Sequence, residues 1–389
     1  MSLRPTNLSS SVGWAPWKPR RSTVAKIFLL CASTILSLVA MEVFLRVISP
    51  PSPWSPVLPL RPHHKMELHV KLNGVSPVAI NSTNRWGMRG DEPPSDWDQH
   101  DTIVTIGGST TLCFYLDDHK TWPYLLQEKL EEDYPNVWVG NGGIDGHTSR
   151  AHIIFMKEVV QKIKPKVVIV LLGHNDLGLS LSEDKRLYGS HFDQNKAGWP
   201  IRFFGRSRLF QVLYLWKQIV YDGVHVVQNQ YHEDLQPKPL SGSEPPLPED
   251  LRTLLPQLDE FRENVGEMIK IARALDVRIV FLTQPMLYDD TDYWRTKEGA
   301  YYWIKQTKST YSAATYWKFL KVYNKELLAI CEREMAECFD LASAVPHSSD
   351  YFYDVGHFNE KGAQLVADQV SQYLRTQSSP VSLGKHQAP

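Results

Sequence analysis

The sequence lacks the short motifs that mark the common cofactor-binding folds. No Gly-x-Gly-x-x-Gly pattern follows the first predicted strand and no Gly-Lys-Ser/Thr phosphate loop occurs, which argues against a nucleotide-binding domain. No cluster of His, Asp or Glu has the spacing of a zinc site. We therefore expect no cofactor and no metal.

The net charge is also close to zero, and cysteines are few. The formal net charge of −1 over 389 residues gives no reason to expect nucleic acid as a partner. The four cysteines show no metal-binding spacing. Cys331 and Cys338 could pair in an oxidising compartment, but free buried thiols are the interpretation that we favour.

Long apolar runs are limited to one segment near the N-terminus. Residues 24–48 are almost continuously apolar, and about 20 such residues span a bilayer. We interpret the segment as a transmembrane signal anchor. A cleaved signal peptide and a buried core helix are the alternatives, although Leu38-Val-Ala40 is a poor cleavage site because Leu38 is large. Basic residues fill positions 1–23, so we expect a cytoplasmic N-terminus, with the remainder outside.

The remainder of the chain divides by composition into three parts. Residues 49–65 are proline-rich and predict a stiff, extended tether. Residues 66–376 predict one large domain, interrupted by insertions at about 178–250 and 286–316, of which the second is rich in aromatic residues. Residues 377–389 are expected to be disordered.

Strand and helix patterns alternate through the large domain. Such alternation predicts an α/β fold, with a central parallel sheet covered by helices on both faces. Strands are predicted at 102–106, 137–139, 167–172, 278–283 and 337–341, and helices at 124–134, 151–163, 317–335 and 360–374; a further helix should bury Leu258, Phe261, Val265, Met268, Ile269 and Ala272.

Polar and glycine-rich stretches fall where these strands end. Ser109 follows the first strand after two glycines, and the carboxyl ends of parallel strands are where open α/β sheets bind ligands. Three further stretches lie at later strand ends or in a loop: Asn141-Gly-Gly-Ile-Asp-Gly146, Gly173-His-Asn-Asp176 and Asp354-Val-Gly-His357.

These four blocks, in this order, resemble the SGNH/GDSL hydrolase family of serine esterases and acylhydrolases, over about residues 102–374. The resemblance implies a flavodoxin-like three-layer α/β/α sandwich. It also implies an oxyanion hole made of the backbone N–H groups of Ser109 and Gly146 and the side-chain amide of Asn175. The usual Gly-Asp-Ser-Leu reads Gly-Gly-Ser-Thr here, which changes neither catalytic group.

The chemistry of the blocks agrees with that resemblance. A serine hydroxyl needs a base to become a nucleophile, and His357 is the candidate base for Ser109. Asp354, three residues before it, would hold the imidazole and stabilise its charged form. The Gly-x-Ser-x-Gly elbow of α/β-hydrolases is missing at Ser109. Cys113 lies four residues after Ser109 and is the weaker nucleophile candidate.

Several neighbouring residues have a structural interpretation that we favour over a functional one. His147 and His174 would pack in loops rather than line a pocket. Asp176 would cap or orient its loop, and Arg85 and Arg89 would brace the sheet.

The sequence thus predicts a membrane-anchored serine esterase whose substrate is an ester, with a short acyl group on a carbohydrate as the specific hypothesis. An O-acyltransferase acting on a polysaccharide is one alternative, and a non-catalytic glycan-binding protein is another.

Overall fold

The computed structural model describes residues 21–48, 58, 60–181, 207–221, 224–228, 244–289 and 311–377. Most of the predicted N-terminal tail, more than half of the tether, most of both insertions and nearly all of the predicted C-terminal tail lie outside the described residues. The chain forms two compact units. One contains residues 1–50 with Ser207–Leu209, and the other contains the remainder.

The first unit is dominated by one apolar helix, α1 (Arg21–Ile48). Its segment Thr23–Ile48 is 26 residues long, exposed, and apolar enough to cross a membrane. A signal sequence near the N-terminus can meet the same criteria of length and composition, so the finding supports the predicted apolar helix, as either a signal anchor or a signal peptide.

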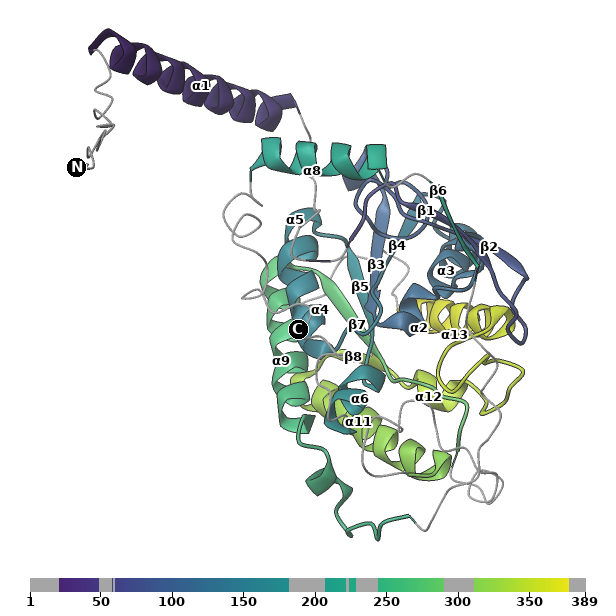
Figure 1. The fold of residues 1–389 in the computed structure, drawn as a ribbon. Helices are drawn as coiled ribbons and strands as arrows, with labels where there is room; N and C mark the ends of the chain where they lie inside the picture. The colour runs from purple at the N-terminus through teal and green to yellow at the C-terminus, as the bar shows by residue number, and fades with distance from the viewer. Residues whose placement is uncertain are drawn as a thin grey trace, which may run out of the picture. The chain divides into compact units, whose positions relative to one another are not determined.

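The second unit is built on a five-stranded parallel sheet with the order β4-β3-β5-β7-β8 (Figure 1). This is the flavodoxin-like strand order, which confirms the predicted α/β fold. The strands are β3 (Asp101–Gly107), β4 (Val137–Gly143), β5 (Val167–Leu171), β7 (Arg278–Leu282) and β8 (Glu337–Phe339).

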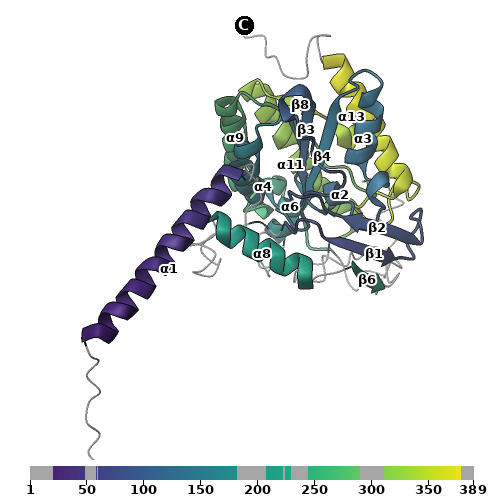
Figure 2. The same cartoon turned by 90° about the horizontal axis from the view of Figure 1, so that it is seen from above.

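Helices cover both faces of this sheet (Figures 1 and 2). Side chains alternate along β5, so that Val168 and Val170 pack in one core while Val167, Ile169 and Leu171 pack in the other. The first face carries α4 (Ser149–Phe155), the π-helical turn η3 (Met156–Val160), α5 (Gln161–Ile163), α9 (Leu258–Leu275) and α11 (Ala313–Glu334); the second carries α3 (Trp122–Glu131) and α13 (Glu360–Gln377).

Shorter elements complete the structure. A second, three-stranded sheet has the order β2-β1-β6, in which β1 is antiparallel to β2 and parallel to β6. The remaining elements are β1 (Lys65–His69), β2 (Val78–Ser82), β6 (Val224–Gln228), α2 (Ser109–Leu112), α6 (His174–Leu181), α8 (Arg208–Tyr221), α12 (Leu341–Ala344) and the 3-10 turns η1 (Trp97–Gln99), η2 (Asp118–Lys120) and η6 (Leu251–Leu254).

The predicted elements are present, with two informative differences in extent. All six residues predicted for the core face of α9 are buried. Strand β4 runs on to Gly143 rather than ending at Val139, because its glycines pair with β3 although they carry no strand signal. The helix predicted at 151–163 is interrupted by the π-helical turn η3.

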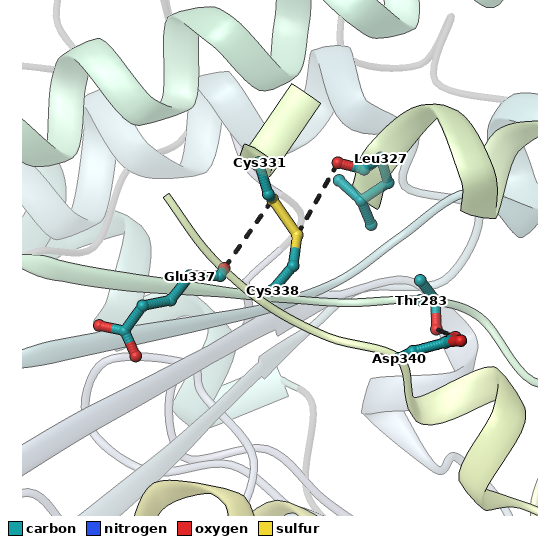
Figure 3. Close-up of a disulfide and its surroundings, with 6 residues drawn as sticks. All are labelled: Thr283, Leu327, Cys331, Glu337, Cys338 and Asp340. Atoms are coloured by element: carbon teal, nitrogen blue, oxygen red, sulfur yellow. Dashed lines mark hydrogen bonds between the residues drawn. A yellow bond between two sulfur atoms is a disulfide. The ribbon is translucent and has the colours of Figure 1, made fainter. Parts of the chain in front are cut away.

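Cys331 and Cys338 form a disulfide that joins the end of α11 to β8 (Figure 3). The preference for free thiols was therefore wrong for this pair. The two cysteines are seven positions apart in the sequence, and the turn between α11 and β8 brings their Cα atoms to 6.0 Å, which is within the usual range for a disulfide.

Arg89 has a structural role, as predicted, but its side chain braces α2 and the turn after it rather than the central sheet. Its side chain is 1% exposed, and its Nε lies 2.8 Å from Oδ1 of Asp118. The remaining guanidinium N–H groups donate to backbone carbonyls, including those of Leu112 and Cys113 at the end of α2. Arg89 therefore holds the short helix that begins at Ser109. Arg85, by contrast, pairs with Glu92 at the surface.

Removing the buried guanidinium should destabilise the domain strongly. Arg89→Ala removes the charged partner of buried Asp118 and the donor to several carbonyls, so the free energy of unfolding should fall by about 3–5 kcal/mol. Denaturant unfolding of the detergent-solubilised protein measures this. The matched control is Arg85→Ala, whose exposed pair should contribute no more than about 1 kcal/mol. Equal losses in the two variants would contradict the bracing role.

Candidate active site

Ser109 is the first residue of α2, directly after the carboxyl end of β3. The two preceding glycines are required by packing. A Cβ on Gly107 would collide with Thr111, and a Cβ on Gly108 would collide with the amide nitrogen of Asn175. The glycines thus bring the Ser109 backbone close to the Asn175 side chain.

His357 and Asp354 lie opposite Ser109, on the loop before α13. Nε2 of His357 is 2.7 Å from Oγ of Ser109, and Nδ1 of His357 is 2.6 Å from Oδ2 of Asp354. The other carboxylate oxygen accepts from the backbone N–H groups of Gly356 and His357. The structure therefore joins the three predicted residues in one hydrogen-bonded chain.

The electrostatics of this chain favour an ionised Asp354 and a basic His357. Burial by itself raises the pKa of Asp354, but the charge and hydrogen bonds of His357 hold it below its usual value. Burial by itself lowers the pKa of His357, but Asp354, together with the charge of Asp145, raises it above its usual value. Such an imidazole can accept a proton from a neighbouring hydroxyl.

The Asn175 side chain lies beside Gly108, the residue before Ser109, and the segment that carries Gly146 lies next to Asn175. Their strands β4 and β5 flank β3 on its two sides. Nδ2 of Asn175 donates to the carbonyl of His147 at 2.8 Å, which fixes the amide next to the Gly146 turn. Gly146 has φ +69, a conformation that suits glycine. The Asn175 amide and the Gly146 turn are thus held next to each other, after the ends of the two strands that flank β3.

Asp176, which follows Asn175, is hydrogen-bonded to Ser149, which lies three residues after Gly146. Its carboxylate accepts from the backbone N–H of Ser149 at 3.0 Å and from the Ser149 hydroxyl at 2.6 Å, at the start of α4. Asn264 donates to the same hydroxyl at 2.9 Å. Asp176 is 4% exposed and is held within this network. Its predicted role in orienting the loop is therefore confirmed.

The other nearby candidates pack rather than react. Burial raises the pKa of Cys113 to about 11, which makes its thiol unreactive at neutral pH. His147 is 1% exposed and packs inside the loop, as expected. His174 lies against Gly356, beside the His357 loop, and burial lowers its pKa to about 4, so it is neutral there.

Comparison with known proteins agrees with this geometry. The model of the family described as "GDSL-like Lipase/Acylhydrolase family" matches residues 105–365, well over half of the chain. The chain belongs to this family. Within the sequence, 75 residues are 31% identical to Esterase TesA of Pseudomonas aeruginosa, and 74 are 30% identical to an arylesterase of Vibrio mimicus. Each match covers 19% of this chain and 37% of the relative, so the chain spans little more than a third of the relatives' length.

Solved structures also align with the chain, at low similarity. Axe2, an acetylxylan esterase from Geobacillus stearothermophilus, aligns with 72% of this chain and 96% of its own, at 14% identity and a TM-score of 0.40. The crystal structure of TesA aligns with 71% of this chain and 98% of its own, at 15% identity and a TM-score of 0.40. At this level, neither structure bears on the substrate.

Two residues of this GDSL-family site were missed from the sequence. The Tyr353 ring stacks on the His357 ring with centroids 5.5 Å apart and planes 5° apart, and its backbone N–H donates to the His357 carbonyl. Asp145 is exposed, precedes Gly146, and contributes negative charge at His357. Asp145 lies within one recognised block and Tyr353 directly precedes another, so their positions in the sequence could have indicated that they belong to the site.

The buried carboxyl of Asp176 should make stability depend on pH. Burial raises its pKa to about 6, above the usual value of about 3.9. The folded state therefore binds the proton more tightly, so this contribution is complete below about pH 4 and is lost as pH rises to about 6. Relative to Asp176→Asn, the wild type should lose about 3 kcal/mol between these values. Denaturant unfolding across pH measures this.

The surface variant Asp368→Asn, which removes a carboxylate that pairs with Lys129, serves as the control. Its difference from the wild type should vary little over the same range. A difference between wild type and Asp176→Asn that stays constant with pH would show that folding does not shift the pKa of Asp176.

Proposed function

We propose that this protein is a serine esterase that acts through an acyl-Ser109 intermediate. The observation that carries the proposal is the hydrogen-bonded chain Ser109–His357–Asp354 at the carboxyl end of the parallel sheet. Membership of the GDSL-like lipase/acylhydrolase family supports the same reaction class.

The proposed reaction has two steps, acylation of Ser109 and hydrolysis of the acyl-enzyme, and the same groups act in both. Nε2 of His357 takes the Ser109 proton while Oγ attacks the ester carbonyl, and Asp354 stabilises the resulting imidazolium. The N–H groups of Ser109, Gly146 and Asn175 stabilise the oxyanion. The alcohol leaves with the proton from His357, and water, deprotonated by the same imidazole, then releases the acid and regenerates Ser109.

For the substrate, we propose a short acyl ester of a carbohydrate. The exposed carboxylate of Asp145 beside the oxyanion donors disfavours anionic esters and suits a neutral polyol. The aromatic residues of the second insertion could stack on sugars, but those that the structure describes give this idea little support. Tyr288, Tyr311 and Tyr316 are buried in the domain core, and those from Tyr293 to Trp303 lie outside the described residues.

We further propose that α1 is retained as a membrane anchor, with the N-terminus in the cytoplasm and the catalytic unit outside. Basic residues precede the apolar segment, which favours this orientation. The Cys331–Cys338 disulfide supports an oxidising compartment.

Replacing the nucleophile tests the proposed reaction. Ser109→Ala should abolish hydrolysis of a neutral acetyl ester without changing thermal stability, while the exposed-site control Ser343→Ala keeps wild-type turnover. Substantial turnover by Ser109→Ala would reject the assignment. If acetylated oligosaccharide formed faster than acetate after a sugar acceptor was added, the assigned function would be acyl transfer rather than hydrolysis.

Removing one oxyanion donor should act on the chemical step. Asn175→Ala should lower kcat by roughly 10²-fold, the usual cost of one such donor. KM should change little, because the donor acts mainly in the transition state. Steady-state kinetics measure both, with the exposed-site variant Asn136→Ala as control. A change confined to KM would make Asn175 a substrate-binding residue instead.

A further inference from the structure

Helix α8 (Arg208–Tyr221) exposes an apolar stripe that the proposed reaction does not use. Val212, Leu213 and Trp216 are 40%, 55% and 62% exposed. Together with Leu209, they follow the i, i+3, i+4, i+7 spacing of one helix face. Isolated exposed apolar residues are common, but a contiguous stripe marks a surface that another body covers.

The beginning of α8 is attached to the apolar helix α1. The Glu42 carboxylate accepts from the backbone N–H groups of Arg208 and Leu209, each at 3.0 Å, and from the Ser207 hydroxyl at 2.8 Å. These N–H groups belong to the first turn of α8, where a helix has no internal acceptors. Residues Ser207–Leu209 therefore form one compact unit with residues 1–50.

The position of Glu42 in α1 sets the level at which α8 begins. From Thr23 to Glu42 the helix is about 30 Å long at about 1.5 Å per residue, which equals the thickness of the hydrocarbon core. If α1 spans a bilayer, Glu42 lies at its outer boundary, where its carboxylate is satisfied by Arg46, at 2.7 Å, and by the start of α8. The first turn of α8 then lies at the membrane–water interface.

The sequence that leads into α8 has the composition of an interfacial segment. Trp199, Phe203 and Phe204 alternate with Arg202 and Arg206. Aromatic side chains favour the headgroup level, and arginines are attracted to anionic lipid. This composition favours a lipid surface over a second copy of the chain as the body that covers the stripe.

We propose that α8 is an interfacial helix whose Leu209–Val212–Leu213–Trp216 stripe is buried in the outer surface of the bilayer that holds α1, with a preference for anionic lipid. Amphipathic helices of this kind bury their apolar face by about 5–10 Å at the headgroup boundary. The proposal rests on α1 being a retained anchor, and it adds a second attachment that holds the catalytic unit to the membrane surface.

Site-specific fluorescence in the full-length protein tests the proposal. The protein is reconstituted into vesicles of phosphatidylcholine and phosphatidylglycerol that contain a lipid-attached quencher. An environment-sensitive label is placed at Leu213→Cys in a Cys31→Ser background, because Cys113 is buried. The matched control is Val78→Cys in the same background, since Val78 is an apolar residue with 47% exposure on β2. Native Cys31, exposed on α1, carries the label in a third sample and reports on insertion of the anchor.

The proposal predicts that the labels at positions 31 and 213 shift to the blue and lose most of their emission to the quencher, while the label at position 78 does neither. Removing phosphatidylglycerol should weaken quenching at position 213 but not at position 31. Quenching at 31 without quenching at 213 would overturn the interfacial helix and leave the anchor intact. A blue shift at 213 without lipid quenching would assign the stripe to a protein partner. Absence of quenching at 31 would reject the anchor itself.

Discussion

The pairing of β3 with β4 on one side and β5 on the other is the constraint on which the site depends. Gly107 is in register with Gly143 and with Leu171, so all three strands end at the same level. Ser109, Gly146 and Asn175 follow these strand ends within a few residues. The pairing of the three strands alone is therefore enough to bring their segments together. The loop that carries Asp354 and His357 then has to reach only the carboxyl end of β3, where Ser109 lies.

Charged groups buried around this edge are all compensated. Arg89 is paired with Asp118 and with carbonyls at the end of α2, Asp176 accepts from Ser149, and Asp354 accepts from His357 and two backbone N–H groups. An unpaired charge at this depth would cost several kcal/mol. The same contacts fix the segments that carry Ser109, Asn175 and His357, so the interactions that satisfy buried charge also position the site.

Much of this arrangement is predictable from the sequence, because the sheet and its helices are specified locally. The run Val167–Leu172 is apolar at every position, which is typical of a central parallel strand, and the α9 face follows the helical period. The site blocks were recognised because three of them follow strand ends and because all four, in this order, resemble those of the SGNH/GDSL hydrolases. The Arg89 contacts, the stacking of Tyr353 on His357 and the Cys331–Cys338 disulfide depend on how loops fold back on the domain. No periodicity in the sequence encodes such contacts.

Labelling by a fluorophosphonate probe tests the central claim most directly, because the probe reacts with a serine only when a base activates it. The account predicts one label per chain, located on Ser109 by peptide mass spectrometry. It also predicts that labelling is absent in Ser109→Ala and slowed by orders of magnitude in His357→Ala. A label on any other residue, or a labelling rate that does not depend on His357, would contradict the account.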